Sequence, residues 1–289
     1  MYTKYYTLIT GASEGFGKAL ALECAERNMN LILVALPEPG LQHRAIFIRK
    51  HYSVDVIAIE KDLCKEENCI SLFNEVTALK ISVNMLINNA GLGSTLFFSV
   101  VSIQLYQKQI KLNIMATTLL TRLFIDKLER NSPANILNVG SLSCFFFLAK
   151  KHVYGASKSY IYSFSKSLRS ELKREGINIS IVCPGCMYTN MSTILLLKSS
   201  GWLARQSAMN PEEVAKITID ALLKGKEVII PGKINKLFLV LNYLIPGFLK
   251  KIITNRQMRT LNSNRSINFP SFPKPTVTNA IVYNSITFK

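Results

Sequence analysis

The sequence predicts an α/β fold built on one doubly wound parallel sheet. Seven short runs rich in Val, Ile and Leu recur along the chain, at residues 5–10, 30–35, 54–60, 85–88, 134–139, 178–183 and 227–230. Continuous apolar runs of this length are typical of strands that are buried on both faces. Segments with helical periodicity lie between them, for example at residues 17–28, 66–79, 104–129 and 154–176. This alternation predicts helices on both sides of the sheet.

Size and composition fit one large α/β domain, although two small domains would also fit the length. Hydrophobic residues make up 48% of the 289 residues, which suits a sizeable core and argues against a disordered chain. The start of the chain has no charged n-region, long apolar h-region or small-residue cleavage site. We therefore expect no secretory signal and a cytoplasmic protein. The cysteines are scattered, so we expect free thiols.

The turn after the first strand carries the first motif. Residues 10–17 read Thr-Gly-Ala-Ser-Glu-Gly-Phe-Gly and lead directly into the first helix. The three glycines allow a tight turn, close approach of the backbone to a pyrophosphate, and close packing of helix on strand. The free N–H groups and positive dipole end of the helix attract phosphates. Any strand-to-helix turn can need one or two glycines, but this context predicts a dinucleotide site.

Polar residues also follow the fourth and fifth strands. Residues 88–91 read Asn-Asn-Ala-Gly, and Ser141 comes just after the fifth strand. The carboxyl ends of the strands near the point where strand order reverses form the ligand crevice of such a sheet, so we expect these loops to meet. The plainer interpretation is that Asn88 and Asn89 form turns and that Ser141 and Ser143 cap a loop.

Tyr154 and Lys158 stand at the head of the helical segment 154–176. Their i, i+4 spacing puts both side chains on one face of the helix. A phenol with a pKa of about 10 is a poor acid–base catalyst at neutral pH, and a neighbouring ammonium lowers that pKa. A surface Tyr and Lys one turn apart would give the same pattern.

Cysteines and histidines give weaker signals. The sixth strand is followed by Cys183, Pro184, Gly185 and Cys186, a Cys-x-x-Cys pattern. A redox or metal role needs a second pair or a thioredoxin-like context, and the sequence has neither. A turn that carries two thiols is the plainer interpretation. The histidines make no ligand pattern, so we expect no metal site.

Together these motifs resemble the short-chain dehydrogenase/reductase family over about residues 5–230, in the family's order and spacing. The resemblance implies a Rossmann-type fold and a catalytic tetrad of Asn113, Ser141, Tyr154 and Lys158. It also implies cofactor contacts from Tyr154 and Lys158 together with Thr10, Gly11, Ser13, Glu14, Gly15, Phe16, Gly17, Asp62, Leu63, Asn89, Ala90, Gly91, Pro184, Gly185 and Thr189.

The resemblance also implies a mechanism. Hydride passes between a nicotinamide and the substrate carbonyl carbon while Tyr154 exchanges a proton with the oxygen. Lys158 lowers the pKa of Tyr154 and holds the ribose hydroxyls, Ser141 hydrogen-bonds the carbonyl oxygen, and Asn113 anchors a water that relays protons. The alternative is a catalytically silent regulatory protein with the same fold, although such a protein would have no chemical reason to keep the whole tetrad.

The end of the second strand bears on cofactor choice. An acid there binds both ribose hydroxyls in an NAD-preferring site, but residues 34–37 read Val-Ala-Leu-Pro. We therefore expect NADP(H) to be favoured, with NAD(H) as the alternative. Family members that prefer NADP usually place Arg where this chain has Leu36, and many carry a basic residue where it has Glu14. His43 and Arg44 are the candidates to approach a 2′-phosphate.

Substrate and partners are predicted from apolar segments. Apolar residues at 145–148 and 195–197 and Trp202 suit a lipid-like ketone, or else they pack on the protein itself. Family members are commonly dimers or tetramers through the helices that bear Asn113 and Tyr154, and we expect a homodimer.

The C-terminus is expected to differ from the rest. We expect residues 1–232 to form the catalytic domain, 233–260 an apolar and basic helical extension, and 261–289 a disordered tail. Part of the net charge of +17 falls beyond residue 228, where Lys and Arg occur without Asp or Glu. The apolar run at 237–245 is far shorter than the roughly 20 residues that span a bilayer. We expect it to lie on an anionic membrane surface, and the alternative is a helix on a partner subunit or over the substrate loop. No specific nucleic acid is expected.

Overall fold

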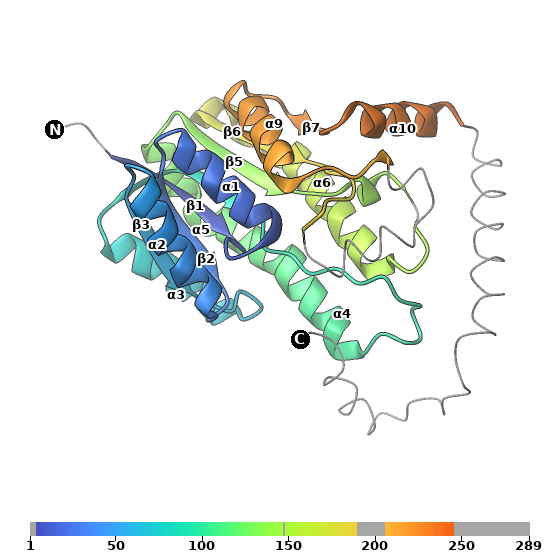
Figure 1. The fold of residues 1–289 in the computed structure, drawn as a ribbon, viewed down its shortest axis with the longest axis horizontal. Helices are drawn as coiled ribbons and strands as arrows, with labels where there is room; N and C mark the ends of the chain where they lie inside the picture. The colour runs from blue at the N-terminus through green and yellow to red at the C-terminus, as the bar shows by residue number, and fades with distance from the viewer. Residues whose placement is uncertain (1–3, 147, 190–205, 246–289) are drawn as a thin grey trace.

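The computed structural model describes residues 4–146, 148–189 and 206–245 (Figure 1). Its described residues contain a seven-stranded sheet in the order β3-β2-β1-β4-β5-β6-β7. The strands are β1 (Tyr5–Thr10), β2 (Asn30–Ala35), β3 (Val56–Glu60), β4 (Ser82–Asn88), β5 (Ala134–Val139), β6 (Ile177–Val182) and β7 (Val228–Ile229). Every neighbouring pair is parallel. The strands β1 to β3 are added toward one edge of the sheet, and the strands β4 to β7 are added from β1 toward the other edge. The predicted doubly wound sheet is therefore confirmed.

Helices cover both faces of this sheet (Figure 1). One face is covered by α1 (Gly15–Glu26), α2 (Pro39–His51) and α9 (Pro211–Leu223). The other is covered by α3 (Glu66–Ala78), α5 (Thr117–Arg130) and α6 (His152–Leu172). Leu8 and Ile9 on β1 show why: consecutive side chains point to opposite faces, and each packs into a different core cluster. Burying one such side chain stabilises the fold by roughly 1.5–3 kcal/mol.

The helix predicted at residues 104–129 is interrupted. It forms as α4 (Ile103–Ile110), a π-helical turn η1 (Lys111–Ala116) and then α5. A π turn is a local widening that is frequent at functional sites, and apolar periodicity does not reveal it. Asn113 lies inside this turn and is buried.

Helix α2 was not predicted from the sequence. Residues 37–40 read Pro-Glu-Pro-Gly, which resembles a turn, and this obscured the spacing of Leu41, Ala45 and Ile48 behind it. All three are fully buried against the core beside α1. The first helix also begins at Gly15, two residues earlier than predicted.

The C-terminal extension begins as a helix, α10 (Lys233–Leu244), beyond β7 at the edge of the sheet (Figure 1). Within the described residues, no helix combines the length and apolar character that crossing a membrane requires. The remainder of the expected extension and the tail lie in residues 246–289, outside the described part. Trp202 and the apolar residues 195–197 also lie outside the described part of the chain.

Candidate active site

The glycine-rich turn is locked to the end of β4. Thr10 Oγ1 accepts hydrogen bonds from the backbone nitrogens of Asn89 and Ala90, each at 3.0 Å. Asn89 Nδ2 donates to the carbonyl oxygens of Thr10 and Gly11 at 2.9 and 3.1 Å. A Cβ added to Gly17 would overlap the Gly11 carbonyl oxygen and the Asn89 side chain. The turn is therefore fixed before any ligand arrives.

This turn leaves bare backbone where a dinucleotide would lie. Gly11 and Gly15 have φ values of +65° and +54°, which side chains rarely adopt. The Cβ that Gly15 lacks would lie 3.5 Å from Thr189, so the loop after β6 reaches the N-terminus of α1. Phe16 is buried beneath the turn. The donor-rich helix end fits a pyrophosphate.

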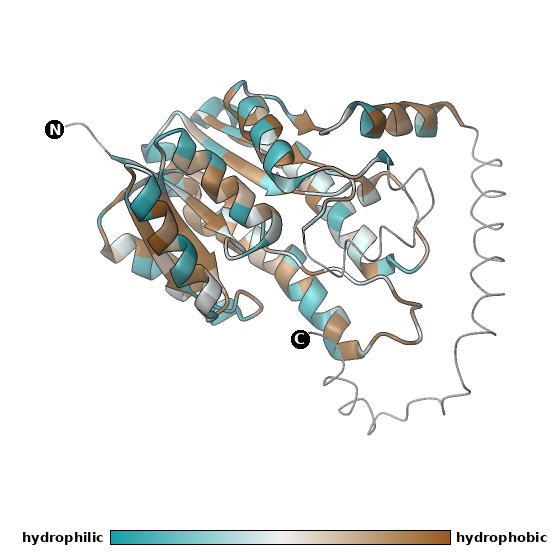
Figure 2. Ribbon diagram, in the orientation of Figure 1, coloured by the Kyte–Doolittle hydropathy of each residue, from teal (hydrophilic) through white to brown (hydrophobic). Residues whose placement is uncertain are grey.

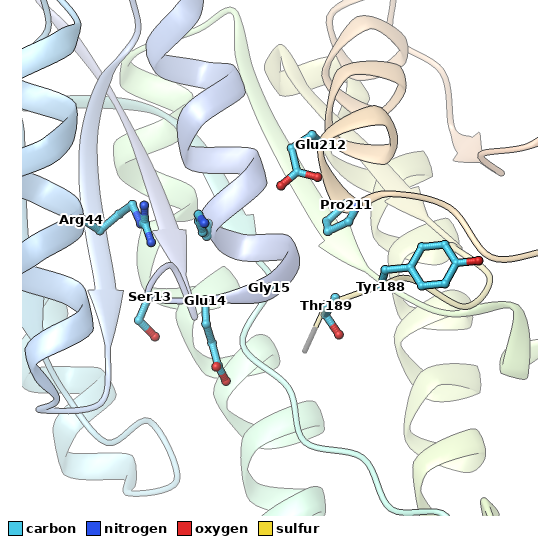
Figure 3. Close-up of a pocket in the computed structure, with 9 residues that line it drawn as sticks. Ser13, Glu14, Gly15, Arg44, Tyr188, Thr189, Pro211 and Glu212 are labelled. Atoms are coloured by element: carbon cyan, nitrogen blue, oxygen red, sulfur yellow. The ribbon is translucent and has the colours of Figure 1, made fainter. Parts of the chain in front are cut away.

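An open cavity of about 330 Å³ lies beside this turn (Figure 3). Figure 3 shows Arg44 pointing from α2 toward α1. Burial lowers the pKa of Arg44, and its Nε has no hydrogen-bond partner among the described residues. The cavity is lined by Ser13, Glu14, Gly15, Lys18, Arg44, Tyr188, Thr189, Pro211 and Glu212. The cavity thus combines two cations and two carboxylates around the first turn of α1.

Asp62 and Leu63 lie just past β3, at the same edge of the sheet. Asp62 Oδ1 accepts a hydrogen bond from Cys64 N at 3.0 Å, and its backbone oxygen accepts from Asn68 Nδ2 at 3.0 Å. Leu63 is buried in the core. The structure therefore gives Asp62 a local turn-forming role.

Asn113 and Lys158 converge beside Gly91. Asn113 Oδ1 accepts from Leu92 N at 2.8 Å, while its Nδ2 donates to Leu92 O at 3.0 Å and Ser157 Oγ at 2.9 Å. Lys158 Nζ donates to the Val139 carbonyl oxygen at 2.7 Å. The Cβ that Gly91 lacks would lie 3.3 Å from both Asn113 Oδ1 and Lys158 Nζ. Glycine here keeps the two polar groups accessible to one another.

Ser141 and Tyr154 face each other across the crevice. Ser141 is the N-cap of a short 3₁₀ helix η2 (Leu142–Cys144), and its Oγ accepts from Ser143 N at 3.1 Å. Burial raises the pKa of Tyr154, and a hydrogen bond with Ser141 offsets part of this rise. The ring of Tyr154 lies 3.4 Å from the Cβ that Gly93 lacks. The phenol and a hydroxyl therefore point at one space above β5.

Lys158 lies one helical turn after Tyr154 on α6, and its own charge depends on its burial. Burial lowers the pKa of Lys158 to about 8, and its ammonium is engaged by Val139. Lys158 Nζ lies 5.9 Å from the centroid of the Tyr154 ring.

The loop after β6 joins this assembly. Pro184 O accepts from Leu142 N at 2.9 Å, which ties the loop to η2. A Cβ on Gly185 would approach the Asn235 amide to 2.8 Å, so helix α10 packs directly on the loop. Among the described residues no group of three or more His, Cys, Asp or Glu side chains could hold a metal ion.

Sequence reasoning missed several supporting residues. Ser157 bridges Asn113 to the Tyr154 carbonyl, to which its Oγ donates at 2.8 Å. Asn88 is no turn former: it is buried and donates to Thr121 Oγ1 at 3.0 Å and Asn138 Oδ1 at 2.9 Å. The only signal in the sequence was a polar residue inside an apolar run.

Comparison with known protein families identifies the family of this chain. The family model for short chain dehydrogenases matches residues 6–198 of the chain. The chain belongs to the short-chain dehydrogenase family. As a member of this family it is an oxidoreductase that acts on an alcohol and carbonyl pair.

Curated relatives and solved structures in the short-chain dehydrogenase family cover most of the chain. A ketoacyl reductase from Nostoc sp. is 28% identical over 267 residues, which are 90% of this chain and 92% of that protein. An 11-beta-hydroxysteroid dehydrogenase-like protein from Arabidopsis thaliana is 31% identical over 81% of this chain and 76% of that protein. A short-chain dehydrogenase from Sphingobium yanoikuyae in complex with NADPH has a TM-score of 0.69 at 23% identity, covering 93% of this chain and 98% of that chain.

Proposed function

We propose that the chain transfers a hydride between NADP(H) and a carbonyl/alcohol pair, with Tyr154 as the proton donor and acceptor. One observation carries the proposal: Ser141, Tyr154, Lys158 and Asn113 gather at the carboxyl ends of β4 and β5, beside the glycine turn. The nearby geometry fits a nicotinamide dinucleotide, because the glycine turn at residues 10–17 leads into the N-terminus of α1 and its backbone N–H groups.

A bound nicotinamide cofactor supplies or accepts the hydride. The turn at residues 10–17 binds the pyrophosphate through backbone N–H groups, and Asn89, Ala90 and Gly91 form the wall of the crevice. Asp62 and Leu63 border the adenine, and Pro184, Gly185 and Thr189 border the nicotinamide. We infer these contacts from the positions of the residues along the crevice.

The chain's own groups manage the proton. Ser141 donates a hydrogen bond to the substrate oxygen, where negative charge develops during reduction. Tyr154 donates its phenolic proton to the same oxygen, and it accepts a proton in the reverse direction. Lys158 holds the ribose hydroxyls of the cofactor. Asn113 fixes the π turn and anchors the water that returns a proton toward Lys158.

Arg44 supports NADP(H) over NAD(H). Its partly buried guanidinium lines the cavity beside Ser13 without a carboxylate partner in the described part of the chain. A phosphate group would satisfy such a cation through charge-assisted hydrogen bonds. His43 is exposed on the outer side of α2, so Arg44 is the stronger of the two candidates. NAD(H) remains the alternative because Glu14 and Glu212 also line this cavity.

The proposed substrate is an apolar, lipid-like ketone. The ketoacyl reductase and hydroxysteroid dehydrogenase relatives support this class by name. Phe145 follows Ser141 closely and packs against Tyr162, with ring centroids 4.9 Å apart. The Phe145 carbonyl accepts from Asn242 Nδ2 at 3.1 Å, so α10 borders the expected substrate loop.

The proposed setting is an anionic membrane surface. Leu237, Val240, Leu241 and Leu244 repeat at helical spacing along α10 and are 54%, 54%, 43% and 71% exposed. In Figure 2, brown hydrophobic segments recur along this helix. Lys233 and Lys236 flank the stripe, which suits a helix that lies in the headgroup region. The contact of Asn242 with the Phe145 carbonyl supports the alternative, a helix over the substrate loop.

The proposed assembly is a homodimer through α5 and α6. Tyr160 is 40% exposed on α6 and hydrogen-bonds Thr118 on α5 at 3.1 Å, and it stacks on Phe164. An aromatic pair on an outer helix face suits contact with a second copy of the chain.

Replacing Tyr154 with Phe tests the central proposal. The substitution keeps the ring and removes the proton, so we expect kcat to fall by roughly 10²- to 10⁴-fold, with NADPH binding retained. NADPH absorbance with a series of long-chain ketones measures the rate, and protein fluorescence measures binding. Full activity in the variant would contradict the assignment of Tyr154. A wild-type protein that binds NADPH but reduces no carbonyl compound would favour the silent regulatory protein.

A further inference from the structure

Two cysteines that are distant in sequence meet beside the candidate active site. Cys144 ends η2 and Cys183 follows β6, and their Sγ atoms lie 3.8 Å apart. The backbones beside them are fixed by hydrogen bonds from Gly140 N to Val182 O at 2.7 Å and from Leu142 N to Pro184 O at 2.9 Å. These bonds continue the pairing of β5 and β6 past the strand ends. The two thiols are therefore held together by the sheet.

The two thiols differ in access to solvent. Cys183 is fully buried and packs with Ile161 and Ile181. Cys144 is half-buried at the rim of the same cluster. A small oxidant can therefore reach Cys144 from solvent while Cys183 stays behind it.

The two thiols also differ in acidity. The hydrogen bond from the Cys183 thiol lowers the pKa of Cys144, with help from the nearby Lys158 ammonium. The same pairing and burial raise the pKa of Cys183. A half-buried thiol of lowered pKa next to a buried thiol of raised pKa is the arrangement of an attacking and a resolving cysteine.

This pairing differs from the one that the sequence pattern offered. The Cys-x-x-Cys pattern joins Cys183 to Cys186, but the structure gives Cys183 a different neighbour, Cys144. The pair also belongs to no metal-binding group among the described residues. The proton transfer assigned to Tyr154 uses neither thiol.

We propose that Cys144 and Cys183 form an oxidisable pair that a hydroperoxide converts into an intramolecular disulfide, and that this disulfide lowers the activity of the adjacent site. The inactivation rests on the proposed function, whereas the disulfide itself does not. The Cys144 thiolate attacks the outer oxygen of the hydroperoxide, giving a sulfenic acid and releasing the alcohol. The Cys183 thiol then attacks the Cys144 sulfur and expels water. In total, two thiols and one hydroperoxide give one disulfide, one alcohol and one water.

Closing this bond moves the site. A disulfide holds its sulfurs about 2.05 Å apart, so the two sulfurs must approach each other from their separation of 3.8 Å. Because Cys183 is enclosed, Cys144 makes most of the movement and carries η2 with it. Ser141 is the N-cap of η2, and Ser159 Oγ donates to Cys144 O at 3.3 Å. We expect Ser141 to turn away from Tyr154 and Ser159 to lose this bond.

The first test is covalent and needs no activity. The full-length protein is treated with hydrogen peroxide or cumene hydroperoxide, its free thiols are alkylated, and its peptides are mapped by mass spectrometry. We expect a peptide pair cross-linked through Cys144 and Cys183 that dithiothreitol removes. A bond between Cys183 and Cys186, or oxidation that spares Cys144 and Cys183, overturns the proposal. Cys186→Ser should keep the cross-link and Cys144→Ser should abolish it.

The second test concerns the switch. Carbonyl reduction by the oxidised wild type should fall at least tenfold and recover with dithiothreitol, while oxidised Cys144→Ser keeps the rate of its reduced form. Cys64→Ser is the matched control, because Cys64 is also half-buried but lies past β3, away from this site. It should respond as wild type does. A disulfide that leaves the rate unchanged refutes the switch. If no carbonyl compound is reduced even before oxidation, the proposed function fails, and the covalent test still decides on the thiol pair.

Discussion

The burial of Lys158 predicts how the stability of the folded protein depends on pH. Its pKa is lowered from 10.5 to about 8 because it is buried. Between these values Lys158 is neutral in the folded protein and protonated in the unfolded chain, so the unfolded state binds more protons and stability rises with pH. Relative to Lys158→Met, the wild type should gain about 1.4 kcal/mol of unfolding free energy per pH unit in this range. Urea unfolding of both proteins at pH 7 to 10 measures the difference. A difference that does not change with pH would mean that the ammonium stays charged.

The position of Arg44 in the cavity predicts a preference for NADPH over NADH. Arg44→Met should weaken NADPH binding by roughly 10- to 100-fold, the loss of a charge-assisted hydrogen bond. NADH has no 2′-phosphate, so its binding should stay the same. Fluorescence titration with both nucleotides gives the two dissociation constants. Lys50→Met removes the same charge from an exposed position on α2 and is the control. Equal losses for NADPH and NADH would contradict a role at the 2′-phosphate.

At the scale of the element, the junction of β1 and α1 depends on Gly17. A methyl group there would overlap the Gly11 carbonyl oxygen, so Gly17→Ala must open the turn. We expect a loss of roughly 1–3 kcal/mol in unfolding free energy and at least tenfold weaker NADPH binding. Gly40→Ala is the control, since its Cβ would meet only Ser13 Cβ at 3.9 Å, and thermal unfolding should show no loss. Wild-type binding by Gly17→Ala would refute close approach of the cofactor to this turn.

At the scale of the whole molecule, α10 carries the proposed contact with a membrane surface. Truncation before α10 would remove Asn235, which is buried against Gly185, so point variants test the surface better. Leu237→Asp combined with Leu244→Asp should abolish co-sedimentation with anionic liposomes at low salt. Ile46→Asp, an equally exposed apolar position on α2, should leave it unchanged. A full-length protein that stays in the supernatant refutes the membrane setting.

Light scattering of the full-length protein tests the proposed homodimer, which a mass near that of one chain would contradict.

The sequence by itself determined the strands and was sufficient to propose the site residues. Buried strands need continuous apolar runs, and a strand-to-helix turn near a phosphate needs glycine, so both leave marks within a few neighbouring residues. The runs at residues 5–10, 30–35 and 134–139 coincide with β1, β2 and β5. The four proposed catalytic residues were identified through the resemblance to the family's motifs, in which Tyr154 and Lys158 stand one helical turn apart.

Only the tertiary structure decided how these residues meet. The π turn at Asn113 forms where Asn113 bonds to Leu92 and Ser157, which lie 21 and 44 residues away. The partner of Cys183 is Cys144 because β5 and β6 pair in one particular register. Lys158 donates to Val139 because α6 packs over the end of β5. Contacts of this kind depend on sheet register and helix packing, and short-range residue patterns carry no information about either.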